Sequence, residues 1–97
     1  MKYVHDVTYT TDQAKVAAHR PQHREYMTQL FDQGRLLFAG PFADDSGALF
    51  VFEADSNEAV SALIGKDPFA VNGVFEKSEV KPWNLVFATT CNMERSA

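Results

Sequence analysis

The 97-residue chain has one cysteine, no excess of positive charge and no long hydrophobic run. A single cysteine, Cys91, excludes a disulfide within the chain and a zinc site built on several thiolates. Nine Lys and Arg against 13 Asp and Glu give a formal charge of −4. That balance argues against non-specific binding to nucleic acid or to anionic lipid. We therefore expect neither a nucleic-acid partner nor a membrane partner.

Targeting segments and cofactor motifs are also missing from the sequence. No segment approaches the roughly 20 apolar residues of a membrane-spanning helix, and Asp6 interrupts the place where a signal peptide carries its apolar core. Together with the lone cysteine, this indicates a reducing compartment, and we expect a cytoplasmic protein. No phosphate loop or dinucleotide-binding pattern occurs, so we expect no cofactor.

Four strands and two helices follow from the spacing of apolar and turn residues. Alternation predicts strands, and apolar residues three or four apart predict helices. The predicted strands are 2–9, 35–42, 48–54 and 75–83, the predicted helices are 21–33 and 55–64, and residues 85–90 extend the last strand or form a fifth.

Proline, glycine and capping residues set the predicted ends of the helices. Pro21 suits the first position of a helix, where its missing N–H would have no partner, and residues 13–19 then form a separate helical turn. Gly34 fits the position just past the end of that helix. Asp55 with Glu58 three residues later is typical of a capping box, which predicts the start of the second helix.

The order β-α-β-β-α-β in about 100 residues predicts an α+β, ferredoxin-like split βαβ fold. Both helices would cover one face of an antiparallel sheet, with the strands in the spatial order 4-1-3-2. The strand at 48–54 is apolar on both faces, so something must cover the other face. A second copy is the simplest cover, and we expect a homodimer through residues such as Phe38, Leu49 and Val51.

This topology brings five chemically useful residues to one end of the sheet. Arg20 and His23 lie at the start of the first helix, Gly40 and Pro41 end the second strand, and Asp67 follows the second helix. We expect these residues to form a site for a small molecule.

His23 is spaced to lie on the buried face of its helix. There it is either a core histidine or an acid/base that faces a pocket. A carboxylate that binds one ring nitrogen fixes the tautomer and strengthens the other nitrogen as a base, and Asp67 is placed to do this. Asp67 before Pro68 is also a good helix cap. The two roles are compatible, because a carboxylate has two oxygens.

The two arginines near His23 also have alternative interpretations. Arg20 either anchors a substrate carboxylate or phenolate or forms a solvated salt bridge to Glu25 or Asp32. For Arg24 the pattern favours a solvated salt bridge to Glu25 or Asp32.

Other histidines are weaker candidates. His19 and His23 are four residues apart, a spacing known for metal ligands on a helix. A helix that begins at Pro21 would leave His19 outside, and no glutamate completes the motif, so we expect no metal site. His5 and Asp6 are neighbours on a strand and point to opposite faces, so only one of them can line a pocket.

Four short blocks resemble one known protein family. Each block alone has little specificity, but the four occur in the family's order within about residues 1–87. The blocks are Arg20-Pro21-x-His23, Gly34-Arg35-Leu36-Leu37-x-Ala39-Gly40-Pro41, Asp67-Pro68-Phe69-x-x-x-Gly73-Val74 and Val80-Lys81-Pro82-Trp83. On these blocks the chain is similar to the YciI-like (YCII-related) family.

The resemblance implies one domain over residues 1–87, with 88–97 as a C-terminal tail. It also implies a dimeric α/β barrel related to muconolactone isomerase-like folds. The family's His–Asp pair, its proposed active site, falls on His23 and Asp67. One branch acts as a dehydrochlorinase on chlorinated hydroxyhydroquinones, which suggests a small aromatic or lactone substrate. The link from Phe42 to Gly47 is shorter than in some members and borders the expected pocket, so substrate identity does not carry over.

The sequence therefore predicts a small homodimeric enzyme of the lyase, isomerase, hydrolase or dehydrochlorinase type, acting on a small cyclic or phenolic substrate. His23 would be the general acid/base and Asp67 its orienting partner, while Arg20, Gly40 and Pro41 would bind the substrate. The alternative from another class is a non-catalytic dimeric module for ligand binding or stress response. A purely structural subunit would have no cavity at this end of the sheet.

Overall fold

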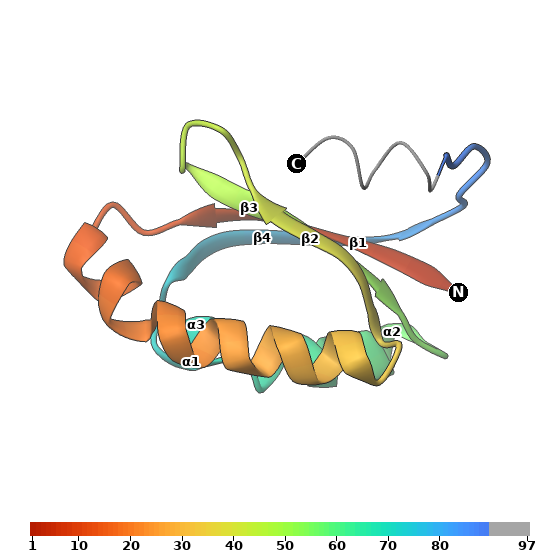
Figure 1. Cartoon of the computed structure of the whole chain (residues 1–97), viewed down its shortest axis with the longest axis horizontal. Coiled ribbons are helices and arrows are strands. Elements are labelled where there is room, and N and C mark those ends of the chain that lie inside the picture. The colour runs from red at the N-terminus through yellow and green to blue at the C-terminus, as the bar shows by residue number, and fades with distance from the viewer. Residues whose placement is uncertain (90–97) are drawn as a thin grey trace.

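Four antiparallel strands form one sheet in the order β2-β3-β1-β4, and the helices pack on one of its faces (Figure 1). The computed structural model describes residues 1–89. The elements are β1 Lys2–Tyr9, α1 Gln13–Asp32, β2 Leu36–Pro41, β3 Gly47–Glu53, α2 Asn57–Gly65, α3 Pro68–Val71 and β4 Phe75–Trp83.

The predicted α+β, ferredoxin-like architecture and the predicted strand order are confirmed. The predicted extension of the last strand over 85–90 is wrong for residues 85–89, which belong to no strand. Cys91 and nearly all of the predicted tail at 88–97 lie outside the described residues. None of the helices within residues 1–89 is long and apolar enough to cross a membrane.

The first helix is longer than predicted and continues through a proline. It begins at Gln13, where the Asp12 carboxylate accepts a hydrogen bond from the Lys15 N–H at 3.1 Å. Pro21 lies inside the helix, where a proline removes one backbone hydrogen bond and crowds the preceding turn. The axis of α1 bends between its first turns and the longer stretch below the sheet (Figure 1). The predicted start at Pro21 is wrong, because the Asp12 cap and the buried Val16 hold the earlier turns in the helix.

The end of α1 is as predicted. Gly34 has φ +74°, a conformation that glycine adopts without strain. Its N–H donates to the Phe31 carbonyl at 3.0 Å, and the Arg35 N–H donates to the Leu30 carbonyl at 2.9 Å. This is the Schellman pattern, which satisfies the last carbonyls of a helix.

The cap of α2 is one residue later than predicted. Ser56, in extended conformation, accepts a hydrogen bond from the Ala59 N–H at 3.1 Å, so Ser56 and not Asp55 is the N-cap. Both residue types cap helices well. The pattern therefore located the helix correctly but missed its first residue.

The two faces of the sheet differ in what covers them. On β1 the alternate residues Tyr3, His5, Val7 and Tyr9 point towards the helices and are buried. The opposite face carries none of the helices within residues 1–89 (Figure 1). There β3 presents Leu49, which is 39% exposed, beside Phe38 of β2, which is 36% exposed, and the more buried Val51. The third strand is thus apolar on both faces, as predicted.

Gly47 marks a close approach between β3 and β1, and it yields a stability prediction. A Cβ at this position would overlap the Val7 carbonyl oxygen, and a backbone atom paired in a sheet cannot move away. We expect Gly47→Ala to lower the free energy of unfolding by about 1–3 kcal/mol or more. Gly65→Ala in α2, whose Cβ meets no atom within 4 Å, should instead add about 0.5–1 kcal/mol. Urea unfolding compares the two, and equal midpoints would contradict the close approach.

Candidate active site

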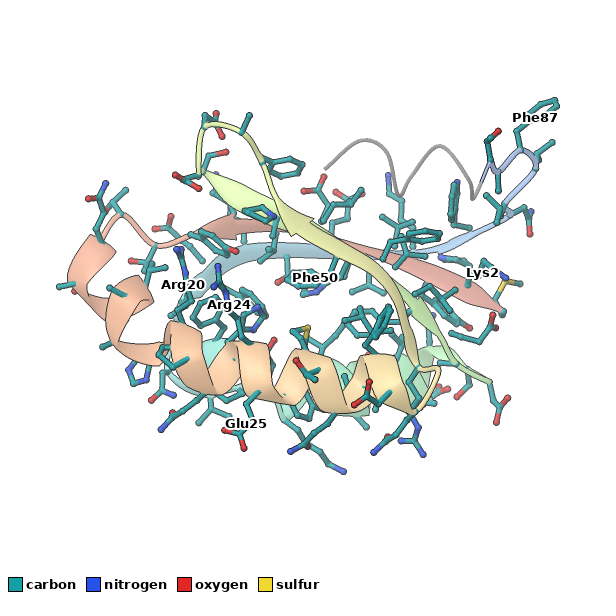
Figure 2. The ribbon with its side chains drawn as sticks, viewed as in Figure 1. Lys2, Arg20, Arg24, Glu25, Phe50 and Phe87 are labelled. Carbon is teal, nitrogen blue, oxygen red and sulfur yellow. The ribbon has the colours of Figure 1, made fainter. Side chains whose placement is uncertain are left out.

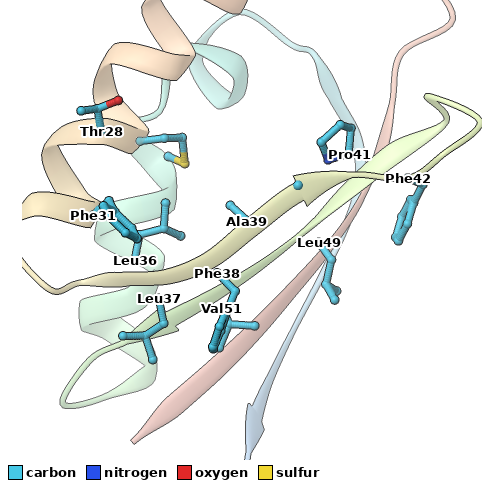
Figure 3. Close-up of a pocket in the computed structure, with 12 residues that line it drawn as sticks. Thr28, Phe31, Leu36, Leu37, Phe38, Ala39, Pro41, Phe42, Leu49 and Val51 are labelled. Atoms are coloured by element: carbon cyan, nitrogen blue, oxygen red, sulfur yellow. The ribbon is translucent and has the colours of Figure 1, made fainter. Parts of the chain in front are cut away.

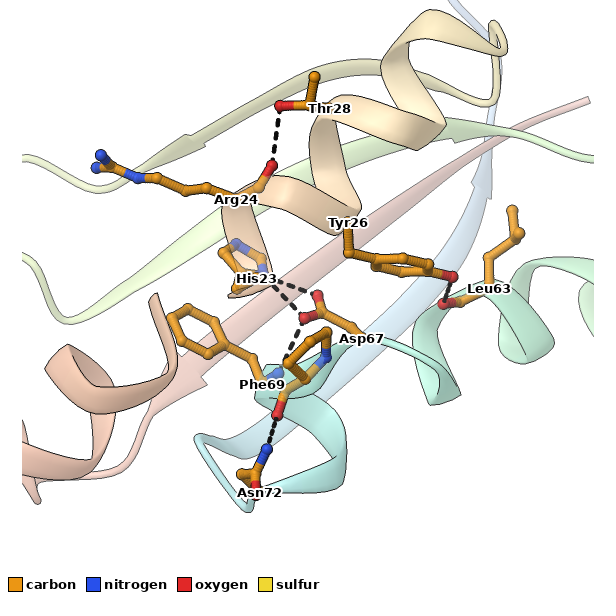
Figure 4. Close-up of polar contacts among 9 residues, drawn as sticks. His23, Arg24, Tyr26, Thr28, Leu63, Asp67, Phe69 and Asn72 are labelled. Atoms are coloured by element: carbon orange, nitrogen blue, oxygen red, sulfur yellow. Dashed lines mark hydrogen bonds and ion pairs between the residues drawn. The ribbon is translucent and has the colours of Figure 1, made fainter. Parts of the chain in front are cut away.

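His23 of α1 and Asp67, the residue before α3, form a buried pair (Figure 4). Nδ1 of His23 lies 2.8 Å from Oδ1 and 2.9 Å from Oδ2 of Asp67, and the residues are 7% and 2% exposed. The predicted contact is therefore present, between residues 44 positions apart. Because an ionised carboxylate only accepts, Nδ1 carries the proton and donates it. Nε2 then has a free lone pair and is the basic nitrogen.

Two further contacts fix the orientation of this pair. Oδ1 of Asp67 also accepts a hydrogen bond from the Phe69 N–H at 2.9 Å, which caps α3 with Pro68 at its first position. The capping role predicted for Asp67 is thus confirmed. The Phe69 ring stacks on the imidazole, with the ring centroids 4.0 Å apart and the planes 7° from parallel. The imidazole is held by a hydrogen bond on one edge and by an aromatic ring on one face.

His23 borders a cavity of about 300 Å³ between α1 and the sheet, a size suited to a small ligand. Within residues 1–89 no buried side-chain nitrogen or oxygen lacks a hydrogen-bond partner. Nε2 of His23 makes no such bond in this part of the chain, so it is accessible, and His23 itself lines the cavity. Of the predicted site residues, all but Asp67 line the cavity; Asp67 lies behind His23. The lining residues are Tyr9, Arg20, His23, Arg24, Met27, Thr28, Ala39, Gly40, Pro41, Ala48, Phe50 and Phe69.

Eight of these twelve lining residues were not predicted, and among them Arg24 and Tyr9 carry groups that can bind a ligand. Arg24 makes no ion pair with Glu25, Asp32 or any other residue within 1–89, so the predicted salt bridge is wrong. Because α1 is continuous, Arg20 and Arg24 are four residues apart on one helix and share a face. Tyr9 ends β1 on the side of the sheet that faces the helices. The alternation of residues along β1 places Tyr9 on this side, so the sequence contained the pattern from which its position could have been predicted.

The other histidines lie outside the cavity. His5 is 1% exposed, with Nε2 3.0 Å from the Ser78 hydroxyl, and Asp6 is exposed on the opposite face. Continuity of α1 places His19 in the same helix as His23, contrary to the prediction. Within residues 1–89 no three histidine, cysteine or carboxylate side chains gather in a way that would hold a metal ion.

His5 yields a prediction for the pH dependence of stability. Burial lowers the pKa of His5 below its ordinary value, while Asp67 and Asp6 partly oppose the shift. The unfolded chain therefore binds a proton more readily than the folded chain, and stability must fall as the pH drops through about 6.5, the ordinary histidine pKa. We expect His5→Phe, which fits among the rings of Phe50 and Phe75, to lose less stability than wild type between pH 7 and pH 5. Equal losses in urea unfolding would contradict this assignment.

A larger apolar hollow of about 770 Å³ runs along β2 and continues onto the uncovered face (Figure 3). Phe31, Phe38, Phe42 and Leu49 line it, with Thr28 as the one polar side chain. None of the described residues that line it carries an acidic, basic or charged group. Despite its size, it is therefore a surface for packing rather than for chemistry.

Comparison with known proteins now places the chain in a family. The model of the YCII-related domain matches residues 1–84. The chain belongs to the YCII-related family. Protein YciI of Escherichia coli O6:H1 is 36% identical over 95 residues, which cover 84% of this chain and 97% of that protein, and YciI of Shigella flexneri gives the same figures. The uncharacterized protein YjpA of Bacillus subtilis is 36% identical over 67 residues, 69% of this chain and 78% of that protein.

Two solved structures share the fold of this YCII-related chain. One is the 5-chloro-2-hydroxyhydroquinone dehydrochlorinase TftG of Burkholderia phenoliruptrix AC1100 in complex with 2,5-dihydroxybenzoquinone. Its TM-score is 0.77 at 21% identity, covering 87% of this chain and 94% of that one. The other is muconolactone isomerase, with a TM-score of 0.62 at 18% identity and 91% coverage of both chains. The predicted YCII-related family and the predicted α+β fold class are confirmed.

Proposed function

We propose that the chain is a small enzyme that needs no cofactor and uses His23 as a general acid/base on a small cyclic or phenolic substrate. One observation carries the proposal: Asp67 binds Nδ1 of His23, and His23 lines a cavity of small-molecule size. A histidine held in this way is set up to take a proton and to return it. The reaction is then an elimination or an isomerisation.

The chemistry follows from the surroundings of His23. Nε2 removes a proton from a carbon or hydroxyl of the ring, and the electron pair left behind moves into the ring. In an elimination, this electron pair then expels a leaving group such as chloride. In an isomerisation, the ring instead takes the proton back from Nε2 at another atom. Asp67 stabilises the imidazolium that forms in between. Phe50 and Phe69 line the cavity with apolar surface, which strengthens electrostatic interactions by keeping water out.

The structural neighbours support this class of reaction at the level of the fold. A dehydrochlorinase removes a proton and a chloride from its substrate, and an isomerase rearranges bonds within one molecule. Both outcomes follow from proton transfer by a single base. The cavity beside His23 gives this chain a place for that transfer.

A substrate screen tests the proposal. Purified protein is mixed with 5-chloro-2-hydroxyhydroquinone and with muconolactone, and chloride release and ultraviolet absorbance are followed. We expect turnover of at least one compound by wild type and loss of that turnover in His23→Ala. Binding of both compounds to His23 without turnover would contradict an enzyme and favour the ligand-binding module.

We further propose that the uncovered sheet face joins two copies of the chain. Phe38, Leu49 and the hollow along β2 make a continuous apolar surface, and exposed surfaces of this kind mark interfaces. Light scattering should give twice the chain mass of 10.8 kDa. Leu49→Glu should halve the mass, whereas Val71→Glu, at a 70% exposed position on α3, should not. A wild-type monomer at micromolar concentration would overturn the dimer.

A further inference from the structure

The charged side chains that line the His23 cavity are both positive, although the chain as a whole is acidic. Arg20 and Arg24 project from α1 towards the sheet (Figure 2). Within residues 1–89 no carboxylate lines this cavity, and neither arginine forms an ion pair there. Two like charges four residues apart on a helix repel each other. The lining of the site therefore carries positive charge that an anion would neutralise.

Tyr9 faces the same space from the end of β1. It is 8% exposed, and its hydroxyl makes no hydrogen bond within residues 1–89 although it is not sealed from solvent. Burial raises the pKa of Tyr9 above its ordinary value; Asp67 and Asp45 act in the same sense, while Arg20 and Arg24 act in the opposite sense. The hydroxyl thus keeps its proton at neutral pH and is a donor without a partner.

Apart from His23 and Thr28, the other side chains that line the cavity are apolar and suit a flat ring. Phe69 stacks on His23 and meets the ring of Tyr9 edge to face, with centroids 5.7 Å apart. Phe50 and Met27 add further apolar lining. Aromatic and sulfur groups of this kind pack well against planar rings. The lining therefore combines two cationic groups and a hydroxyl donor with a mainly apolar surface.

We propose that the substrate is a small ring acid whose carboxylate is bound by Arg20 and Arg24 together, with the Tyr9 hydroxyl as a third donor. A carboxylate has two oxygens and accepts from several donors at once. It thus matches two planar guanidinium groups and one hydroxyl better than a single phenolate oxygen does. In this position the ring lies against Phe50 and Phe69, beside Nε2 of His23. The catalytic use of this arrangement rests on the proposed function, whereas the binding does not.

Benzoate and benzamide, which have nearly the same shape and differ in charge, test the inference. Binding is measured by NMR from the shifts of the His23 ring protons. Benzoate should bind the wild-type protein at least about 10-fold more tightly than benzamide. Arg20→Gln and Arg24→Gln should each lower the affinity for benzoate about 10-fold, and Tyr9→Phe should lower it about 3- to 10-fold. The affinity for benzamide should change little in all three variants.

Arg35→Gln is the matched control, since Arg35 is exposed and does not line the cavity. It should leave benzoate binding unchanged, and circular dichroism checks that each variant is folded. Equal binding of benzoate and benzamide would overturn the inference, as would no shift at His23 with about 10 mM benzoate. So would an effect of Arg35→Gln as large as that of Arg20→Gln. Benzoate binding without turnover of any substrate would refute the proposed enzyme and leave the carboxylate site standing.

Discussion

Replacing His23 by alanine should lower turnover by about 100- to 10,000-fold, the usual contribution of a positioned acid/base. The variant should still fold, because His23 lies at a cavity and not in the centre of the core. It should lose about 1–3 kcal/mol of stability, since the carboxylate of Asp67 loses one partner and the Phe69 ring loses its stacking contact. Initial rates with a substrate found in the screen, together with urea unfolding, measure both effects.

Two further variants separate catalysis from folding. His23→Gln keeps an N–H donor for Asp67 but has no basic nitrogen, so its stability should be nearer to wild type while its turnover falls as in His23→Ala. His19→Ala removes a histidine from the same helix that does not line the cavity, and its turnover should be unchanged. Full activity in His23→Gln would show that the proton moves through another group.

The fold was predictable because its signals are local and agree with one another. The alternation in β1 and β3 and the glycine at position 34 each predict an element, and the order of elements leaves few topologies. The predicted start of α1 at Pro21 was wrong because the preference of proline for the first helical position was given more weight than the helical spacing of the buried residues around it. Val16, His23, Met27 and Leu30 follow at intervals of seven, four and three residues. This helical spacing runs through the proline without a break.

The contact at the centre of the site was predictable because topology and complementary chemistry both pointed to the same two residues. His23 and Asp67 were paired by topology and by complementary chemistry, and the structure brings them within 2.8 Å. Arg24 was assigned to a salt bridge because Glu25 and Asp32 are acidic residues nearby in the chain. A helix predicted to begin at Pro21 leaves Arg20 outside it, so the sequence did not indicate that Arg20 and Arg24 share one helix face. Tyr9 was overlooked since a tyrosine at the end of a strand has the same pattern whether it meets a core or a cavity.

Two substitutions, Asp67→Ala and Asp67→Asn, should distinguish the role of Asp67 as the cap of α3 from its role as the partner of His23. Asp67→Ala removes the cap of α3 and leaves Nδ1 of His23 without an acceptor. Loss of a cap costs about 0.5–2 kcal/mol and an unsatisfied buried donor about 1–3 kcal/mol, so we expect a loss of about 2–5 kcal/mol. Asp67→Asn keeps the shape and one acceptor oxygen, which can still serve the Phe69 N–H. Its stability should fall by about half as much or less.

Activity should respond differently from stability in these two variants. In Asp67→Asn the new amide group can donate to Nδ1, which favours the tautomer with the proton on Nε2 and takes the basic lone pair away from the cavity. Turnover should then fall by about 10- to 100-fold, the range for partners that orient a histidine, and less than in His23→Ala. Nitrogen NMR of the imidazole reports the tautomer directly, and urea unfolding reports the cap. If Asp67→Asn kept both the wild-type tautomer and full turnover, Asp67 would be a helix cap alone, and the acid/base role of His23 would lose its support.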